Sequence, residues 1–356
     1  MDSVCKSNDA LDTLVPYDPK YLPAKAFLAA NENTDDISPE VRRVIEMKLS
    51  DLSFNRYPDP LANVLREKIA AGNGIERNQV LVGNGGDELL FNLALAWGGS
   101  GRKFINLPPT FSVYAQNARL TQTEMIDIAR NQDYSIAEQA VLDRIGQGDI
   151  NFIVVTSPNN PTGNLADSDF IERLLRTSNA LVMVDEAYCE FSQTSVLPLL
   201  RSHKNLVILR TFSKAYSLAG VRLGYIMAHE EVIDEFIKVR QPYSVDSLSQ
   251  VIGSCVFDHR CNFTAKIDRI IEERKRVYNE LKRIDQVEVY PSSANFLLFK
   301  TPDAANVWER LYDHGVLVRD FSSTPGLRDC LRVTIGSSEE NSLFLSELHK
   351  TLANKE

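Results

Sequence analysis

The sequence predicts an α/β protein: a large, mostly parallel sheet flanked by helices, followed by a smaller α+β domain. Short apolar runs without polar alternation, as expected for strands buried on both faces, recur through much of the chain. Helical patterns such as Asp87–Trp97 and Asp167–Leu175 separate them, and this alternation predicts parallel strands joined by helices. The expected strands are Val80–Val82, Lys103–Leu107, Phe152–Ser157, Leu181–Val184, Leu206–Arg210 and Tyr225–Ala228.

Three segments are expected along the chain. Residues 1–38 form an arm, rich in Asn, Asp and Pro, that joins the smaller domain. Residues 39–245 form the large domain, which begins with a helix because Ser38 is a favourable N-cap and Pro39 fits a first helical turn. Residues 246–356 form the small domain. Its expected elements are a long amphipathic helix over Ala265–Ile284, strands around Val287–Tyr290, Ala294–Phe299 and Cys330–Ile335, a helix near Ala304–His314 and a final helix.

The composition argues against several classes of function. The 356 residues are 44% hydrophobic and 24% charged, which is ordinary for a globular enzyme. A net charge of −9 argues against non-specific binding to nucleic acid or to anionic membranes. No signal peptide or apolar run of transmembrane length is found, so a cytoplasmic location is expected. The five cysteines form no C-x-x-C pair and have no histidines at zinc spacing, so no metal is expected.

The most informative stretch, residues 210–225, contains Lys214. A lysine amine that is neutral and immobilised is a good nucleophile toward an aldehyde. The hydroxyls of Thr211 and Ser213 and the guanidinium of Arg222 are groups that bind a phosphate monoester. An aldehyde and a phosphate on one small molecule describe pyridoxal 5′-phosphate (PLP). Taken alone, the stretch also fits a solvated loop.

A glycine-rich segment, residues 83–88, lies between an expected strand and an expected helix. Backbone N–H groups at Gly85, Gly86 and Asp87 would bind the cofactor phosphate at the positive end of the helix dipole. A tight strand-to-helix turn without a ligand is the alternative.

Two further segments follow buried strands, at the sheet edge where α/β proteins bind ligands. Asp185, placed beside a pyridine nitrogen, would keep that nitrogen protonated, as an electron sink requires. Tyr188 and the amide of Asn160 would donate hydrogen bonds to the phenolate oxygen of the same ring. The alternatives are a helix N-cap for Asp185 and an unliganded loop around Asn160.

Aromatic side chains complete the expected cofactor site. Phe111 would lie flat on the pyridine ring and exclude water from one face; Tyr114 competes for this role but is favoured as a packing residue. Tyr57 would add a phosphate contact from a neighbouring subunit. Core packing and a Pro-rich turn are the respective alternatives. One ligand explains all of these segments together, whereas structural roles must explain each separately.

Segments 83–88, 157–163, 185–188 and 211–224 resemble the aspartate-aminotransferase fold (fold type I) of PLP enzymes. The resemblance runs in order through nearly the whole chain, and within that superfamily the chain is most similar to the histidinol-phosphate aminotransferases. The narrower resemblance rests on Pro16-Tyr17, Asn31-Glu32-Asn33, Arg56-Tyr57-Pro58-Asp59-Pro60, Pro242-Tyr243, Gly315-Val-Leu-Val-Arg-Asp320 and Leu331-Arg-Val-Thr-Ile-Gly336, together with the glycine-rich segment.

The resemblance implies a seven-stranded large sheet and a homodimer whose active sites lie at the interface, where Tyr57 reaches the partner's cofactor. It further implies a substrate pocket formed by Tyr17, Asn33, Tyr243, Arg319 and Arg332, in which the two arginines hold the anionic end of the substrate. A structural ion pair is the alternative for either arginine.

The chain departs from the family pattern at one place. The usual proline after Asn-Glu-Asn is Thr34, and Asp35 and Asp36 replace a smaller turn, which affects the expected path of the arm.

Transamination is the expected activity. Lys214 would hold PLP covalently and, once displaced by the substrate amine, act as general base toward the substrate carbon. L-Histidinol phosphate and 2-oxoglutarate would give imidazole-acetol phosphate and glutamate with ping-pong kinetics. Aromatic amino-acid transamination and threonine-phosphate decarboxylation on the same scaffold are the alternatives, and a PLP-fold regulator without turnover is disfavoured.

Overall fold

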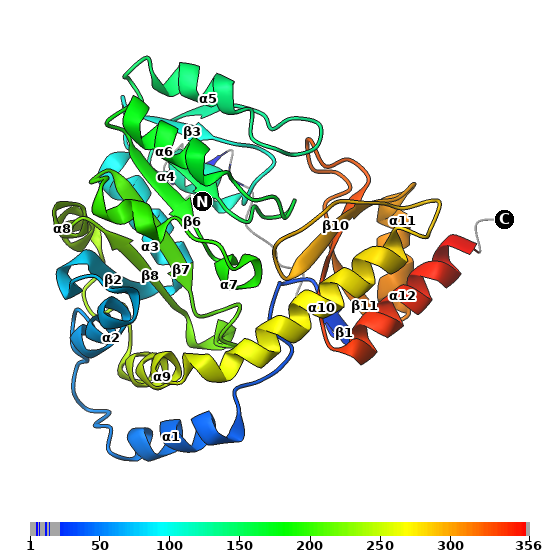
Figure 1. Ribbon diagram of the computed structural model, residues 1–356, viewed down its shortest axis with the longest axis horizontal. Coiled ribbons are helices and arrows are strands. Elements are labelled where there is room, and N and C mark those ends of the chain that lie inside the picture. The colour runs from blue at the N-terminus through cyan, green and yellow to red at the C-terminus, as the bar shows by residue number, and fades with distance from the viewer. Residues whose placement is uncertain (1–4, 6, 8–10, 13, 15–21, 354–356) are drawn as a thin grey trace.

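The computed structural model describes residues 5, 7, 11, 12, 14 and 22–353, which contain a large and a small sheet (Figure 1). The large sheet has seven strands in the order β2-β8-β7-β6-β5-β3-β4. Every neighbouring pair is parallel except those of β8, which runs antiparallel to β2 and β7. The predicted mostly parallel sheet is thus confirmed. Its strands are β2 (Val80–Asn84), β3 (Lys103–Asn106), β4 (Glu124–Asp127), β5 (Phe152–Thr156), β6 (Leu181–Asp185), β7 (Leu206–Thr211) and β8 (Leu223–Ala228).

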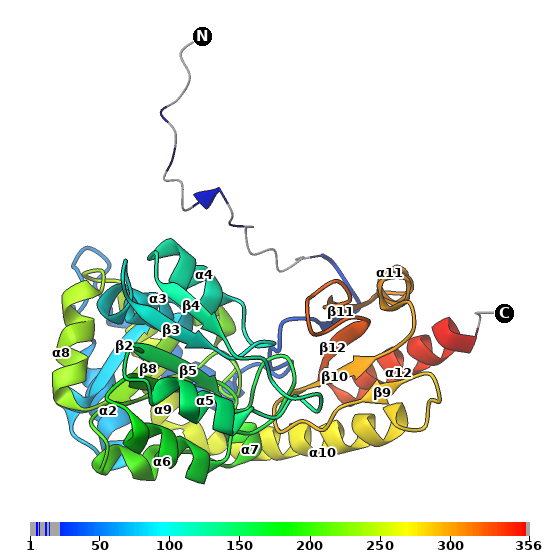
Figure 2. The ribbon, with the colours of Figure 1, turned by 90° about the horizontal axis from the view of Figure 1, so that it is seen from above.

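Helices cover both faces of the large sheet (Figures 1 and 2). One face shares a hydrophobic core with α1 (Pro39–Ser50), α2 (Asn63–Asn73), α5 (Glu138–Ile145), α6 (Ser168–Thr177) and α9 (Ser247–Asp258). The opposite face shares a core with α3 (Gly85–Trp97), α4 (Val113–Leu120) and α8 (Glu230–Val239). Burial on both faces explains why the central strands are apolar throughout.

Side chains of the central strands alternate between these two cores, because successive residues of a strand point to opposite faces. On β6, Val182 and Val184 face the α2 and α6 side, whereas Leu181 and Met183 face the α3 and α4 side. By the same alternation Asp185 faces the α3 side and the next residue, Glu186, faces the other.

The small sheet has five strands in the order β1-β11-β12-β10-β9. Strand β1 belongs to the N-terminal arm and pairs in parallel with β11. Three helices bury one face of the sheet. The elements are β1 (Ala26–Leu28), β9 (Glu288–Val289), β10 (Phe296–Lys300), β11 (Val316–Asp320), β12 (Cys330–Thr334), α10 (Thr264–Leu281), α11 (Ala304–Asp313) and α12 (Ser338–Ala353).

Helix α10 connects the two parts of the molecule (Figure 1). It begins after η5 (Arg260–Phe263), passes α7 (Cys189–Ser192), and ends beneath the small sheet. Helix α9, in contrast, packs on α1 and α2. We therefore propose that the division between the domains lies at the start of α10, rather than between residues 245 and 246 as expected from the sequence. The remaining short helices are η2 (Arg77–Gln79), η3 (Leu197–Arg201) and η4 (Ala219–Val221).

The first long helix begins as its sequence predicts. The Ser38 side chain accepts a hydrogen bond from the backbone N–H of Val41, and Pro39 occupies the first turn. The unusual acidic pair just before it is bound by two arginines, Asp35 by Arg269 of α10 and Asp36 by Arg42 of α1. Within the described residues, every helix is too short or too polar to cross a lipid bilayer.

Candidate active site

A cavity of about 470 Å³ lies at the carboxyl ends of β5, β6 and β7, between the large sheet and the arm. This is the sheet edge at which open α/β proteins bind ligands. Most of the side chains proposed from the sequence for the cofactor meet here. They are Gly86, Asp87, Phe111, Asn160, Asp185, Tyr188, Thr211, Ser213, Lys214 and Arg222, joined by Arg332 from the small sheet.

The other proposed residues lie elsewhere. Tyr57 is 81% exposed and stacks on Tyr243, with 4.6 Å between the ring centroids, away from the lining of this cavity. Asn33 donates from Nδ2 to the carbonyl of Ala215 at 3.3 Å. Arg319 lines a neighbouring cavity, and Gly85 is not among the residues that line the first one. Tyr17 falls outside the described residues.

Lys214 follows β7 in a buried turn. Its Nζ donates to the carbonyl of Ala30 in the arm, at 2.9 Å. Burial, together with the positive charge of Arg332, lowers the pKa of Lys214 from 10.5 to about 8. The amine therefore loses its proton far more easily than an exposed lysine, as a nucleophile or general base near neutral pH requires.

Asp185 occupies the last position of β6 and is 4% exposed. One carboxylate oxygen accepts from the Ala187 backbone N–H at 3.0 Å, and the other accepts from the hydroxyl of Tyr114 at 2.5 Å. Burial raises the pKa of Asp185 to about 6, while the Tyr114 hydrogen bond opposes this rise. A cationic partner such as a pyridinium would stabilise the ionised form of this buried carboxylate.

Tyr114 is a site residue that the sequence did not reveal. It was interpreted as a packing residue and is indeed buried, but its hydroxyl bridges Asp185 and Thr156 Oγ1, the latter at 2.8 Å. Thr156 and Asp185 are register partners on β5 and β6. No local pattern signals this contact, because the three residues are brought together only by the sheet.

Part of the cavity lining has the character of an anion site. The first turn of α3 contributes Gly86 and Asp87, where backbone N–H groups lack helical partners. Gly85 has φ +75°, and a Cβ there would lie 2.8 Å from Nη2 of Arg222. The glycine thus leaves room for the guanidinium, which pairs with Asp87 at 2.9 Å.

Gly224 brings strand and helix together at this site. A Cβ on Gly224 would lie 2.7 Å from the carbonyl carbon of Gly85 and from the backbone nitrogen of Gly86. Next to it, the hydroxyls of Thr211 and Ser213 lie 3.0 Å apart and both line the cavity. Hydroxyls, helix N–H groups and an arginine together suit a phosphate monoester.

Two further hydrogen-bonding side chains, Tyr188 and Asn160, line the cavity. The hydroxyl oxygen of Tyr188 accepts from Asn31 Nδ2 at 3.0 Å, and a tyrosine hydroxyl is a donor as well as an acceptor. The Oδ1 atom of Asn160 accepts from Arg332 Nη1 at 2.5 Å, which leaves Nδ2 as the group that donates. Both donors match the phenolate oxygen of a pyridoxal ring.

A second cavity of about 340 Å³ adjoins the first, with Phe111, Asn160 and Arg332 in the walls of both. It also contains Arg319 and Asp320. Arg332 is 5% exposed, lies over the Phe296 ring at 5.2 Å, and donates to the Ala29 carbonyl at 2.7 Å.

Among the described residues, no cluster of His, Cys, Asp or Glu has the geometry of a metal site.

Comparison with known proteins identifies the family. A model of "Aminotransferase class I and II" matches residues 24–348. The chain belongs to this aminotransferase family. It is 39% identical over 345 residues to histidinol-phosphate aminotransferase 1 of Carboxydothermus hydrogenoformans, covering 97% of this chain and 98% of that protein. It is 36% identical to histidinol-phosphate aminotransferase of Ruminiclostridium cellulolyticum, covering 96% and 97%. The resemblance predicted from the sequence is confirmed.

Solved structures share the fold. Histidinol-phosphate aminotransferase from Sinorhizobium meliloti, in complex with pyridoxal-5′-phosphate, has a TM-score of 0.88 at 22% identity over 99% of both chains. L-Threonine-O-3-phosphate decarboxylase from Porphyromonas gingivalis has a TM-score of 0.81 at 27% identity, covering 92% of this chain and all of that one. The aminotransferase family depends on PLP, and the lysine, carboxylate and anion site of this cavity fit that cofactor.

Proposed function

We propose that this protein is a histidinol-phosphate aminotransferase that converts L-histidinol phosphate and 2-oxoglutarate to imidazole-acetol phosphate and L-glutamate. The observation that carries the proposal is the convergence of Lys214, Asp185 and Arg332 on one cavity. The full-length curated relatives that carry this name support the choice of substrate.

PLP, when bound, stores the electron pair released at the substrate carbon and carries the amino group between the two substrates. Asp185 would bind the ring nitrogen and keep it protonated. Asn160 and Tyr188 would donate to the ring oxygen. The phosphate would be held by Gly86, Asp87, Thr211, Ser213 and Arg222, with Gly85 shaping the turn and Phe111 covering one ring face.

Lys214 would form the covalent link to the cofactor and later move the substrate proton. Its Nζ takes the proton from the substrate carbon, which requires a neutral amine. The lowered pKa of Lys214 supplies that form at modest cost.

Arg332 and Arg319 would bind the phosphate of histidinol phosphate and, in the second half-reaction, a carboxylate of 2-oxoglutarate. Arginine binds both anions by donating hydrogen bonds from the same planar guanidinium group. Arg332 is the stronger candidate, because it lines both cavities and contacts Asn160. Asn33 and Tyr17 of the arm are proposed to border the substrate pocket.

We further propose a cytoplasmic homodimer with shared sites. Tyr57 and Tyr243 form an exposed aromatic pair, and Phe54, Val64 and Leu248 are exposed as well. Large exposed apolar side chains are typical of a surface that another subunit covers. Tyr57 would then complete the phosphate site of the partner, and Tyr243 would border its substrate.

The decisive experiment supplies the purified protein with histidinol phosphate and 2-oxoglutarate and measures glutamate. Turnover that exceeds that with phenylalanine supports the proposal. Release of CO2 from threonine phosphate without an oxo acid would instead assign a decarboxylase, and faster turnover of phenylalanine or tyrosine would assign an aromatic aminotransferase. A Lys214→Ala variant, expected to be inactive, excludes contaminating activity.

A further inference from the structure

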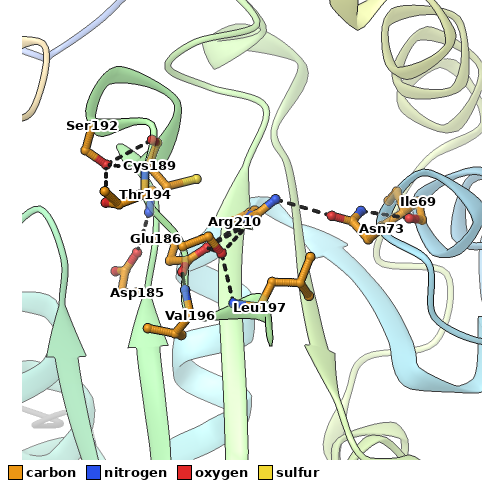
Figure 3. Close-up of polar contacts among 12 residues, drawn as sticks. Ile69, Asn73, Asp185, Glu186, Cys189, Ser192, Thr194, Val196, Leu197 and Arg210 are labelled. Atoms are coloured by element: carbon orange, nitrogen blue, oxygen red, sulfur yellow. Dashed lines mark hydrogen bonds and ion pairs between the residues drawn. The ribbon is translucent and has the colours of Figure 1, made fainter. Parts of the chain in front are cut away.

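Behind the floor of the cavity, on the opposite face of the large sheet, two charged side chains are buried against each other (Figure 3). Glu186 is 2% exposed, and the Arg210 side chain is 14% exposed. Figure 3 shows Glu186, which directly follows β6, and Arg210 of β7 pointing toward one another. Neither residue lines the cavity, and the proposed reaction does not use them.

Glu186 and Arg210 are held in place by hydrogen bonds to each other and to neighbouring residues. One Glu186 oxygen accepts from Arg210 Nε at 2.9 Å and from Ser195 Oγ at 2.8 Å, and the other accepts from the Val196 backbone N–H at 2.7 Å. Arg210 Nη2 donates to Ser195 Oγ at 2.7 Å. Through Nη1 the guanidinium also reaches Asn73, the last residue of α2, at 3.3 Å.

Each member of the pair is the direct chain neighbour of a cavity residue. Glu186 follows Asp185, which would hold the ring nitrogen, and Arg210 precedes Thr211, which would hold the phosphate. Because side chains alternate along a strand, the ion pair and the two ligand residues lie on opposite faces of the same two strand ends. A backbone hydrogen bond also joins the two strand ends, because the N–H of Glu186 donates to the carbonyl of Leu209 at 2.8 Å.

Stability alone gives little reason for such a pair. When two charges are buried, their mutual attraction offsets the free-energy cost of lost hydration only if their geometry is good. A well-packed apolar pair of similar volume often gives a protein of equal or greater stability. Val184 and Ile208 on this face are apolar and fully buried, and the carboxylate of Glu190 also lies within electrostatic reach of Arg210. What an ion pair with directed hydrogen bonds adds, compared with apolar contacts, is a defined geometry.

We propose that Glu186 and Arg210 are positioning residues that fix the ends of β6 and β7 relative to each other, and thereby the spacing between Asp185 and Thr211. PLP carries its nitrogen in a rigid ring and its phosphate on a short arm of that ring, so both groups are bound well only within a narrow range of this spacing. The inference depends on how the cofactor is bound and not on the amino donor. A failed histidinol phosphate assay therefore leaves it intact.

The test compares PLP affinity with stability in full-length variants. Glu186→Gln keeps the shape of the side chain and removes its charge, and Arg210→Lys keeps a charge but lacks the fork. Each protein is freed of PLP, its melting temperature is measured, and PLP is titrated back by absorbance. We expect the dissociation constant for PLP to rise about tenfold in each variant, a change equivalent to one lost hydrogen bond to a charged group.

Val182→Ala is the matched control. Val182 lies on the same face of β6, is fully buried, and does not contact the ion pair through any hydrogen bond. Its truncation should lower the melting temperature of the PLP-free protein and leave PLP affinity unchanged. If Glu186→Gln and Arg210→Lys behave like Val182→Ala, the pair is only structural and the proposal is overturned. If Glu186→Gln fails to fold, Arg210→Lys alone decides by the same criterion.

Discussion

The hydroxyl of Tyr114 lies 2.5 Å from the carboxylate of Asp185, and both side chains are buried. A hydrogen bond to a buried charge contributes roughly 1.5–3 kcal/mol. This bond counteracts the burial that raises the pKa of Asp185. A neighbour that extends from α4 therefore favours the ionised form of the side chain expected to bind the ring nitrogen.

Tyr114→Phe should lower the affinity for PLP without leaving a cavity in the hydrophobic core. The ring stays in place, but Asp185 loses its hydroxyl donor, so the pKa of Asp185 should rise above about 6 and its carboxylate should bind a cationic ring less well. We expect an increase of about tenfold in the dissociation constant for PLP, at about 1.4 kcal/mol per factor of ten. Titration of the PLP-free variant checks this, and an affinity equal to that of the wild type would contradict it.

The reactivity of Lys214 should follow its lowered pKa. Because the pKa of this amine falls from 10.5 to about 8 in the folded protein, the charged form is disfavoured there. Its unfavourable contribution to stability is complete below about pH 8 and disappears as the pH rises toward 10.5. The rate of PLP capture by the PLP-free protein should accordingly rise with pH, with a midpoint near 8.

Arg332→Gln provides the control for this interpretation. The charge of Arg332 contributes to the lowered pKa of Lys214. Removing that charge should move the midpoint of PLP capture to higher pH. Stopped-flow absorbance over a pH series measures both proteins. A midpoint that stays in place would show that the charge of Arg332 does not contribute to the lowered pKa of Lys214.

Gly224→Ala should disrupt the anion site of the cavity. The added methyl group would meet the backbone of Gly85 and Gly86, which cannot move aside as a flexible side chain can. We expect a loss of roughly 1–3 kcal/mol in the free energy of unfolding, together with weaker PLP binding. Gly220→Ala is the matched control for stability, since a Cβ there has no other atom within 4 Å. Urea unfolding of both variants decides.

Mixing two inactive variants tests the shared active site. Lys214→Ala removes the reacting amine, and Tyr57→Ala removes the ring proposed to reach the partner. If Tyr57 acts across the interface, a mixed dimer contains one intact site, so random re-association should restore about a quarter of the wild-type activity. Activity that stays at the level of the separate variants would place Tyr57 in its own subunit's site or outside catalysis.

The sequence predicted the elements whose pattern is local and missed those that depend on distant partners. The buried strands from β2 to β8 are nearly all visible as apolar runs. Strand β4 is not recognisable as an apolar run, because it is a four-residue edge strand with exposed ends. Strand β1 has only three residues and exists because β11 lies beside it.

The same limit applies to the site. Strand ends and a glycine turn place Asp185, Lys214 and Gly86 by local rules, so the sequence alone pointed to them. The partner of Asp185 is 71 residues away in the chain, and the carbonyl that accepts from Lys214 is 184 residues away. Such contacts arise from the packing of the two sheets and the arm, which short-range patterns do not encode.

The hydrogen bond between Arg332 and Asn160 has a consequence for how the protein senses its substrate. The guanidinium proposed to receive the donor's anion already holds the amide proposed to touch the cofactor's oxygen. If both roles hold, an incoming anion would compete with the Asn160 amide for the same cation. Binding of an anionic donor would then alter the contact between Asn160 and the cofactor ring before any covalent step, whereas a donor without an anionic group would leave that contact unchanged.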